Sequence, residues 1–160
     1  MDNKLRKPAI TLLITLLVGS LYAFTTVFFE FIEFYFNEGT IFKVNDCITP
    51  NPVTTACFYG AFGFLISFIW AYRINNYQVV TNKINQYFYL NLLLIGCTIF
   101  AWYNNYSTMY TYFFDNKEIF IGCTGKLIQN PFTTPCFIGA SIFTVALLIS
   151  TYILVKIKRI

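Results

Sequence analysis

Four long apolar segments alternate with polar stretches along the 160-residue chain. They cover residues 9–29, 57–72, 87–103 and 136–155. The first segment holds 21 residues without a charge. A helix of that length spans roughly 31 Å, about the thickness of the hydrocarbon core of a bilayer. The pattern predicts an all-α membrane protein with four transmembrane helices in a single membrane domain over residues 1–160. The cell membrane is its expected location.

A short motif occurs twice, at an offset of 79 residues, directly before the second and fourth apolar segments. Residues 51–61 and 130–140 are identical at 8 of 11 positions. An Asn-Pro pair starts turns, and a threonine before a helix caps its free amides. We therefore expect a tandem two-helix repeat, at about 9–73 and 87–155, joined by a short cytoplasmic connection at 74–86. The residues expected to start the helices are Asn51, Pro52, Thr55, Asn130, Pro131 and Thr134.

Lysine and arginine are concentrated at the two termini and in the connection between the repeats. Eight of the 11 basic residues lie there when Arg73, directly before the connection, is included, and the two long loops hold the other three. Because Lys and Arg are retained on the cytoplasmic side during insertion, we expect both termini in the cytoplasm and both long loops outside it. The net charge of +4 then reflects topology. Since the basic residues form no patch, nucleic acid is not an expected partner.

Four of the five cysteines lie in or beside the long loops: Cys47, Cys57, Cys123 and Cys136. The predicted outer side is an oxidising compartment in which disulfides persist. Four cysteines allow three connectivities, and we expect pairing within each repeat, Cys47 with Cys57 and Cys123 with Cys136. Such bonds are interpreted as structural staples that tie each loop to the following helix. Cys97 lies in the third segment and is expected to be a small packing residue.

The same cysteines allow a second interpretation. Two external cysteine pairs on a four-helix bundle with both termini inside resemble, in topology, the DsbB and vitamin K epoxide reductase types of membrane thiol oxidoreductase. The resemblance implies electron transfer between a partner protein and a membrane quinone, and no other cofactor is expected. These families carry a Cys-x-x-Cys pair at a helix start, and the sequence contains none. No residue is therefore assigned a catalytic role.

Small and polar residues inside the apolar segments predict helix packing. Gly60, Gly63 and Ser67 share one helix face, and such faces let neighbouring transmembrane helices approach closely. Gly139 is the counterpart of Gly60 in the second repeat. Asn91 is expected to hydrogen-bond a neighbouring helix, because an unpaired amide is costly in a bilayer. The proposed partners lie on the first helix and are Ser20, Thr25 and Thr26.

Polar and aromatic residues follow the first and third segments. Glu30 and Glu33 are three positions apart, and we interpret them as an acidic outer rim rather than a cation or proton site. Trp102 leads into a tyrosine-rich stretch that suits either a binding surface or an interfacial belt; its tyrosines are Tyr103, Tyr106, Tyr110 and Tyr112. Asn105-Tyr106-Ser107 matches a glycosylation acceptor.

The chain has no histidine, which removes the commonest general base and metal ligand. No phosphate loop, metal cluster or nucleophile with its base occurs in the sequence. We expect a non-enzymatic subunit of a membrane assembly, whose partners are the lipid bilayer and other membrane proteins or a second copy of the chain. A membrane thiol oxidoreductase is the alternative. A small transporter or channel along the axis between the repeats is the third hypothesis.

Overall fold

The computed structural model describes residues 3–40, 42, 51–76, 80–114, 120–121, 127–128 and 130–158. Over these residues the chain is almost entirely helical. The long helices are α1 (Asn3–Glu38), α2 (Ala56–Asn76), α3 (Val80–Phe114) and α4 (Pro135–Lys158). Short 3-10 helices, η1 (Pro52–Thr54) and η2 (Pro131–Thr133), directly precede α2 and α4. All four long helices are long and apolar enough to cross a membrane.

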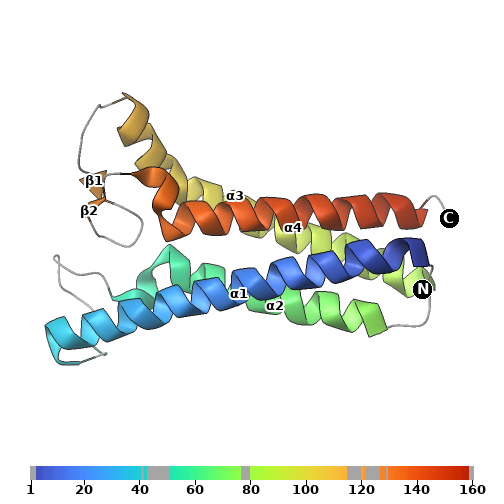
Figure 1. Cartoon of the computed structure of the whole chain (residues 1–160), viewed down its shortest axis with the longest axis horizontal. Coiled ribbons are helices and arrows are strands. Elements are labelled where there is room, and N and C mark those ends of the chain that lie inside the picture. The colour runs from blue at the N-terminus through green and yellow to red at the C-terminus, as the bar shows by residue number, and fades with distance from the viewer. Residues whose placement is uncertain are drawn as a thin grey trace.

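The four helices lie side by side as a bundle, with both chain termini at one end (Figure 1). We call this the terminal end, and the opposite end, where α2 and α4 begin, the loop end. Helix α1 packs against α2 and α4, α3 packs against α4 and α2, and α2 meets α4 across the centre. At the loop end, β1 (Phe120–Ile121) pairs antiparallel with β2 (Leu127–Ile128).

The centre of the bundle is formed by two stacked aromatic rings. Phe64 of α2 and Phe143 of α4 are parallel to within 5°, with ring centroids 3.7 Å apart. Both side chains are fully buried, and further buried residues of the core, Leu12, Leu16, Leu90 and Leu94, come from α1 and α3. Because lipid is as apolar as these side chains, the stacking and close packing hold the helices together, and the hydrophobic effect contributes little.

The helices extend further than the apolar segments predict. The predicted connection at 74–86 is wrong in extent, since α2 continues to Asn76 and α3 begins at Val80. The Tyr-rich stretch after Tyr103 is also helical, whereas the sequence predicts a loop there. Its hydroxyl and amide groups bond back to the preceding turn, as Thr111 Oγ1 does to the carbonyl of Ser107 at 3.0 Å.

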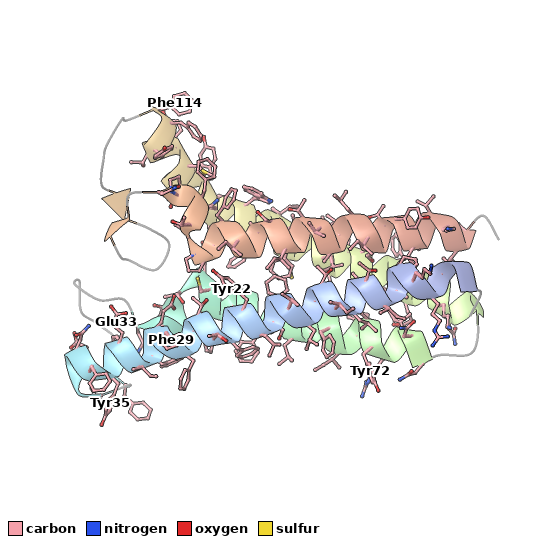
Figure 2. The ribbon with its side chains drawn as sticks, in the orientation of Figure 1. Tyr22, Phe29, Glu33, Tyr35, Tyr72 and Phe114 are labelled. Carbon is pink, nitrogen blue, oxygen red and sulfur yellow. The ribbon has the colours of Figure 1, made fainter. Side chains whose placement is uncertain are left out.

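Helices α1 and α3 project beyond α2 and α4 at the loop end (Figure 1). At 36 and 35 residues they are about 54 and 52 Å long, whereas α2 and α4 are about 32 and 36 Å long, close to a bilayer's hydrocarbon thickness. We call the projecting parts, residues 28–38 and 103–114, the α1 arm and the α3 arm. Figure 2 shows Tyr35 and Phe114 near the ends of these arms, pointing away from the bundle.

Candidate functional site

The two helix-start motifs adopt the same local structure. Asn51 precedes η1, and its Oδ1 accepts a hydrogen bond from the amide of Val53 at 3.0 Å. Asn130 precedes η2, and its Oδ1 accepts the equivalent bond from Phe132 at 3.0 Å. An asparagine side chain that bonds the backbone two residues on fixes a turn. The motif therefore directs the chain into the bundle at both places.

A threonine then caps each long helix. The amide of Phe58 donates to Thr55 Oγ1 at 3.4 Å, and that of Phe137 donates to Thr134 Oγ1 at 3.3 Å. Both hydroxyls also donate at 2.7 Å to the carbonyl of the proline three residues earlier. Both threonines are buried, so these bonds satisfy amides that water does not reach. The second helical position after each cap is a cysteine.

The two cysteines meet at the centre of the loop end. Cys57 Sγ lies 3.6 Å from Cys136 Sγ, which is longer than the roughly 2.05 Å of a disulfide, so the two sulfurs touch without being bonded. Cys57 carries a free thiol. The sequence predicts a disulfide between Cys57 and Cys47. In the structure Cys57 is instead a free thiol whose sulfur faces Cys136 of α4. Cys47 and Cys123 lie outside the described residues, so the predicted pairing is a proposal.

A cavity of about 40 Å³ lies beside the two sulfurs and is lined by all four helices. Its walls are mainly apolar and include Tyr22, Phe64, Phe100 and Phe143. Gly60 and Gly139 line it one turn along from the cysteines, and a Cβ built on either glycine meets no atom within 4 Å. The expectation that these two glycines bring helices into contact is therefore wrong. Their missing side chains leave the space open.

Other glycines do make close contacts. A Cβ on Gly63 would lie 3.2 Å from Cys97 Sγ and 3.3 Å from Phe143 Cζ. Gly19 is closer still: a Cβ there would lie 2.6 Å from Phe64 Cε1. The sequence interpretation did not single out Gly19. The sequence feature that could have identified it is the Gly19-Ser20 pair inside the first apolar segment, because pairs of small residues let transmembrane helices pack closely.

The polar residues of the bundle bond differently from the prediction. Asn91 Oδ1 accepts a hydrogen bond from Thr151 Oγ1 of α4 at 3.1 Å, so the predicted partners on α1 are wrong. The physical reason is that α3 packs on α4, while the hydroxyls of Thr25 and Thr26 bond carbonyls of their own helix. Ser67 is fully buried and its hydroxyl has no hydrogen-bond partner among the described residues.

Glu30 lies where the α1 arm meets the start of α2. Thr55 Oγ1 donates to Glu30 Oε2 at 3.4 Å, and Glu30 is half-buried whereas Glu33 is exposed. The carboxylate therefore stands near the free amides at the start of α2, where a negative charge is favoured. No group of three or more potential metal-ligating side chains occurs in the part of the chain that the structure describes.

The α3 arm presents an uncharged row of aromatic rings. Tyr103, Tyr106, Tyr110 and Phe114, which we call the aromatic stripe, are 78%, 65%, 47% and 71% exposed. Their spacing places them on one helix face. Tyr106 and Tyr110 have ring centroids 6.0 Å apart, and Tyr110 stacks on Phe114 at 4.9 Å. Lys83 is the single charged residue of α3, so the stripe has no charged neighbour on its helix.

The opposite face of the α3 arm is anchored to the bundle. Phe132 of η2 makes edge-to-face contacts with Phe113 and Tyr112 at centroid distances of 6.3 and 6.1 Å, and with Phe137 at 5.2 Å. Asn105 is only 1% exposed. It is therefore inaccessible as a glycosylation acceptor in the folded protein. Because one face of the arm is fixed in this way, the aromatic stripe is held outward.

Comparison with known proteins adds no family. No family model matches the sequence, and neither the search of curated proteins nor that of solved structures returned a similar protein.

Proposed function

We propose that this small membrane protein is a non-enzymatic subunit that binds another membrane chain through the aromatic stripe of the α3 arm. Both termini are placed in the cytoplasm and the arms outside it, as the distribution of Lys and Arg indicates. The observation that carries the proposal is the row of four exposed, uncharged aromatic side chains on a helix that is longer than the bilayer requires.

The chemistry of the stripe suits protein binding. Tyrosine and phenylalanine are enriched, and charged residues depleted, at the centres of protein interfaces. Tyr110 stacks on Phe114 and Tyr106 lies tilted against Tyr110, so the rings lose less side-chain freedom when a partner binds. Away from the stripe, Asn105 is buried and Tyr112 contacts Phe132 of η2, which fixes the arm before binding. A preformed apolar face on a rigid helix is the surface that a helix of a second chain can cover.

The test compares two double substitutions in mildly solubilised membranes. Replacing Tyr106 and Tyr110 with alanine is expected to convert a discrete assembly into the isolated chain on a native gel. The control replaces two exposed tyrosines outside the stripe, Tyr72 and Tyr89, with alanine; Tyr72 lies at the terminal end of α2 (Figure 2). This variant loses the same number of atoms and should leave the assembly intact. An assembly that survives the first pair of substitutions would exclude the stripe as its interface.

A second candidate function, thiol–disulfide exchange, is favoured by the sulfur geometry. We infer that Cys136 forms a disulfide with a loop cysteine, and that the Cys57 thiolate attacks Cys136 Sγ, which lies 3.6 Å away. The new bond joins Cys57 to Cys136, and the former partner of Cys136 leaves as a thiolate. The proton of Cys57 passes to that leaving sulfur through solvent. One disulfide is broken and one is formed, so no external oxidant is needed.

The exchange is tested by trapping thiols with N-ethylmaleimide in membranes equilibrated with a glutathione buffer, followed by mass spectrometry without reduction. A Cys57–Cys136 cross-link should be found in a fraction of the chains and should disappear in Cys57→Ser. Cys97→Ser is the matched control, because Cys97 is also a free thiol of the bundle. Complete alkylation of Cys57 at every glutathione ratio would contradict the exchange.

The tandem two-helix duplication supports both candidates without deciding between them. The caps of α2 and α4, the two cysteines and the two stacked phenylalanines all fall at positions 79 residues apart. A duplicated unit places equivalent residues around a common axis. Under this proposal Cys57 faces Cys136, and Phe64 faces Phe143, because each pair lies on the axis. The same symmetry supplies two arms at the loop end.

A further inference from the structure

The seam between α2 and α3 contains an open groove. Towards the loop end it holds a hollow of about 550 Å³ with Tyr59, Tyr89, Leu92 and Phe100 in its walls and Phe143 at its base. Tyr59, Tyr89, Leu92 and Phe100 are exposed side chains. In a chain that spans a membrane, such a surface faces hydrocarbon. The groove is therefore open to the acyl region of the bilayer.

A second hollow, of about 420 Å³, lies along the same seam towards the terminal end. Ile66 and Ile69 form its apolar wall, and Arg73 and Gln86 lie at the end nearest the membrane surface. The two hollows share Trp70. From Tyr59 to Arg73 the groove follows about 21 Å of helix, which exceeds half of a hydrocarbon core of about 30 Å.

The groove is a fixed feature of the helix contacts. Trp70 Nε1 donates to Gln86 Oε1 at 2.7 Å and ties α2 to α3 near the terminal end. Further along, Gly63 approaches Cys97. Beside these contacts the seam is open at Gly96, where an added Cβ would meet no atom within 4 Å. The glycine therefore keeps the groove wide where Tyr89 and Leu92 form its wall.

We propose that the groove binds one anionic phospholipid, with an acyl chain along the α2–α3 seam and the phosphate at Arg73. The walls offer hydrocarbon and aromatic surface, and the charged and amide side chains of the lining, Arg73 and Gln86, lie at the end where a headgroup lies. The Arg73 guanidinium can bind two phosphate oxygens at once. The Gln86 amide nitrogen is a further donor, since Trp70 occupies its oxygen.

Charge complementarity identifies the occupant. A groove that binds an apolar helix needs no cation at one end, whereas binding of a phosphodiester headgroup requires a positive charge such as that of Arg73. Arg73 also lies at the end of α2 that is predicted to be cytoplasmic, where anionic lipids are concentrated. The site shares no residue with the aromatic stripe, and its headgroup end at Arg73 lies at the opposite end of the molecule from the stripe. Failure of one proposal therefore leaves the other untouched.

The experiment uses the full chain in phosphatidylcholine nanodiscs doped with a photoactivatable phosphatidylglycerol that carries a diazirine on one acyl chain. Labelled peptides are mapped by mass spectrometry. Labelling is expected to concentrate on residues 89–100 of α3 and 59–70 of α2. Gly96→Leu should reduce it severalfold by filling the groove, while Val145→Leu, on an exposed face of α4, should not. Circular dichroism confirms that each variant is folded.

Headgroup selectivity is measured by competition with unlabelled phosphatidylglycerol or phosphatidylcholine. Arg73→Gln should lower the preference for the anionic lipid about fivefold, equivalent to about 1 kcal/mol. Lys158→Gln, the same charge change on an exposed residue of α4, should leave the preference unchanged. Labelling spread evenly over the exposed faces of all four helices, or equal competition by the two lipids, would overturn the proposal. Exclusion of the probe by a bound protein chain would overturn it as well.

Discussion

Glycine has opposite roles on two sides of this bundle. On one side, Gly19 of α1 brings its helix so close that an added Cβ would lie 2.6 Å from the Phe64 ring and 3.0 Å from Ile142. On the other side, Gly96 of α3 faces open space in the groove beside α2. We call these the closed seam and the open groove. Both glycines lie inside long apolar helices, so composition does not distinguish them.

The difference follows from what stands opposite each glycine. Phe64 is stacked on Phe143 and cannot turn away, so it fills the space that Gly19 leaves. In the open groove, the Trp70–Gln86 hydrogen bond holds α2 and α3 together nearer the terminal end. At Gly96 itself no atom lies within 4 Å of an added Cβ. The contrast shows that a small residue in a membrane helix produces either a contact or a hollow, depending on its neighbours.

The largest expected effect is at the centre of the closed seam. Phe64→Ala removes the ring that stacks on Phe143 and packs over Gly19. We expect the free energy of unfolding to fall by roughly 3 kcal/mol, the low end of the range for a buried Phe→Ala substitution that leaves a cavity. The low end applies because the unfolded helices are surrounded by lipid rather than water. The measurement is unfolding by SDS in mixed micelles. A loss as small as that for exposed Phe62→Ala would show that the stack is not the core.

Gly19→Ala should destabilise the protein by about 1–3 kcal/mol in the same assay. The added methyl meets a ring that cannot move, and overpacking of this kind costs that amount. Alanine otherwise favours helix over glycine, so the sign of the change is informative. An increase in stability would mean that α1 does not approach Phe64 as closely as described.

Trp70→Phe tests the contact that bounds the open groove. It removes the Nε1 donor to Gln86 Oε1 while keeping an aromatic ring, and we expect a loss of about 1 kcal/mol, the net value of a hydrogen bond. Trp102→Phe is the control, because its bond to Thr144 Oγ1 at 3.0 Å is exposed and should contribute less. Equal effects would indicate that Trp70 does not hold the seam.

Gly96→Ala is the matched opposite of Gly19→Ala and should have the smallest effect. Nothing opposes the new methyl group, so the variant should gain up to about 1 kcal/mol from helix propensity. The same assay measures it. If both glycine variants lose stability equally, the distinction between the closed seam and the open groove fails.

The number of helices and the starts of α2 and α4 were predictable from the sequence, whereas the start and the end of α3 were not. Apolar runs of bilayer length identify the spans because hydrocarbon requires them. The α3 arm carries no such signature: residues 104–112 are mainly tyrosine, asparagine, serine and threonine, whose composition resembles a loop. They continue the helix because stacked rings such as Tyr110 and Phe114 support it. The two-residue strands at Phe120–Ile121 and Leu127–Ile128 were too short for any periodicity.

The candidate site was predictable only where its geometry depends on residues adjacent in the sequence. The turn at Asn51 and the cap at Thr134 follow from local hydrogen bonding, and the sequence placed both. The approach of Cys57 to Cys136 depends on how α2 meets α4, and spacing along the chain left three connectivities open. Asn91 was assigned partners on the wrong helix for the same reason, since its bond to Thr151 follows from which helices are neighbours.

The most direct test of the proposed docking function places a photo-crosslinking benzoylphenylalanine at position 106 in native membranes. Position 72 serves as the control, because Tyr72 is comparably exposed at the opposite end of the bundle. The proposal predicts one discrete protein adduct from position 106, none from position 72, and loss of the adduct when Tyr110 is also replaced with alanine. Adducts only to lipid at position 106, or the same protein adduct from both positions, would contradict it.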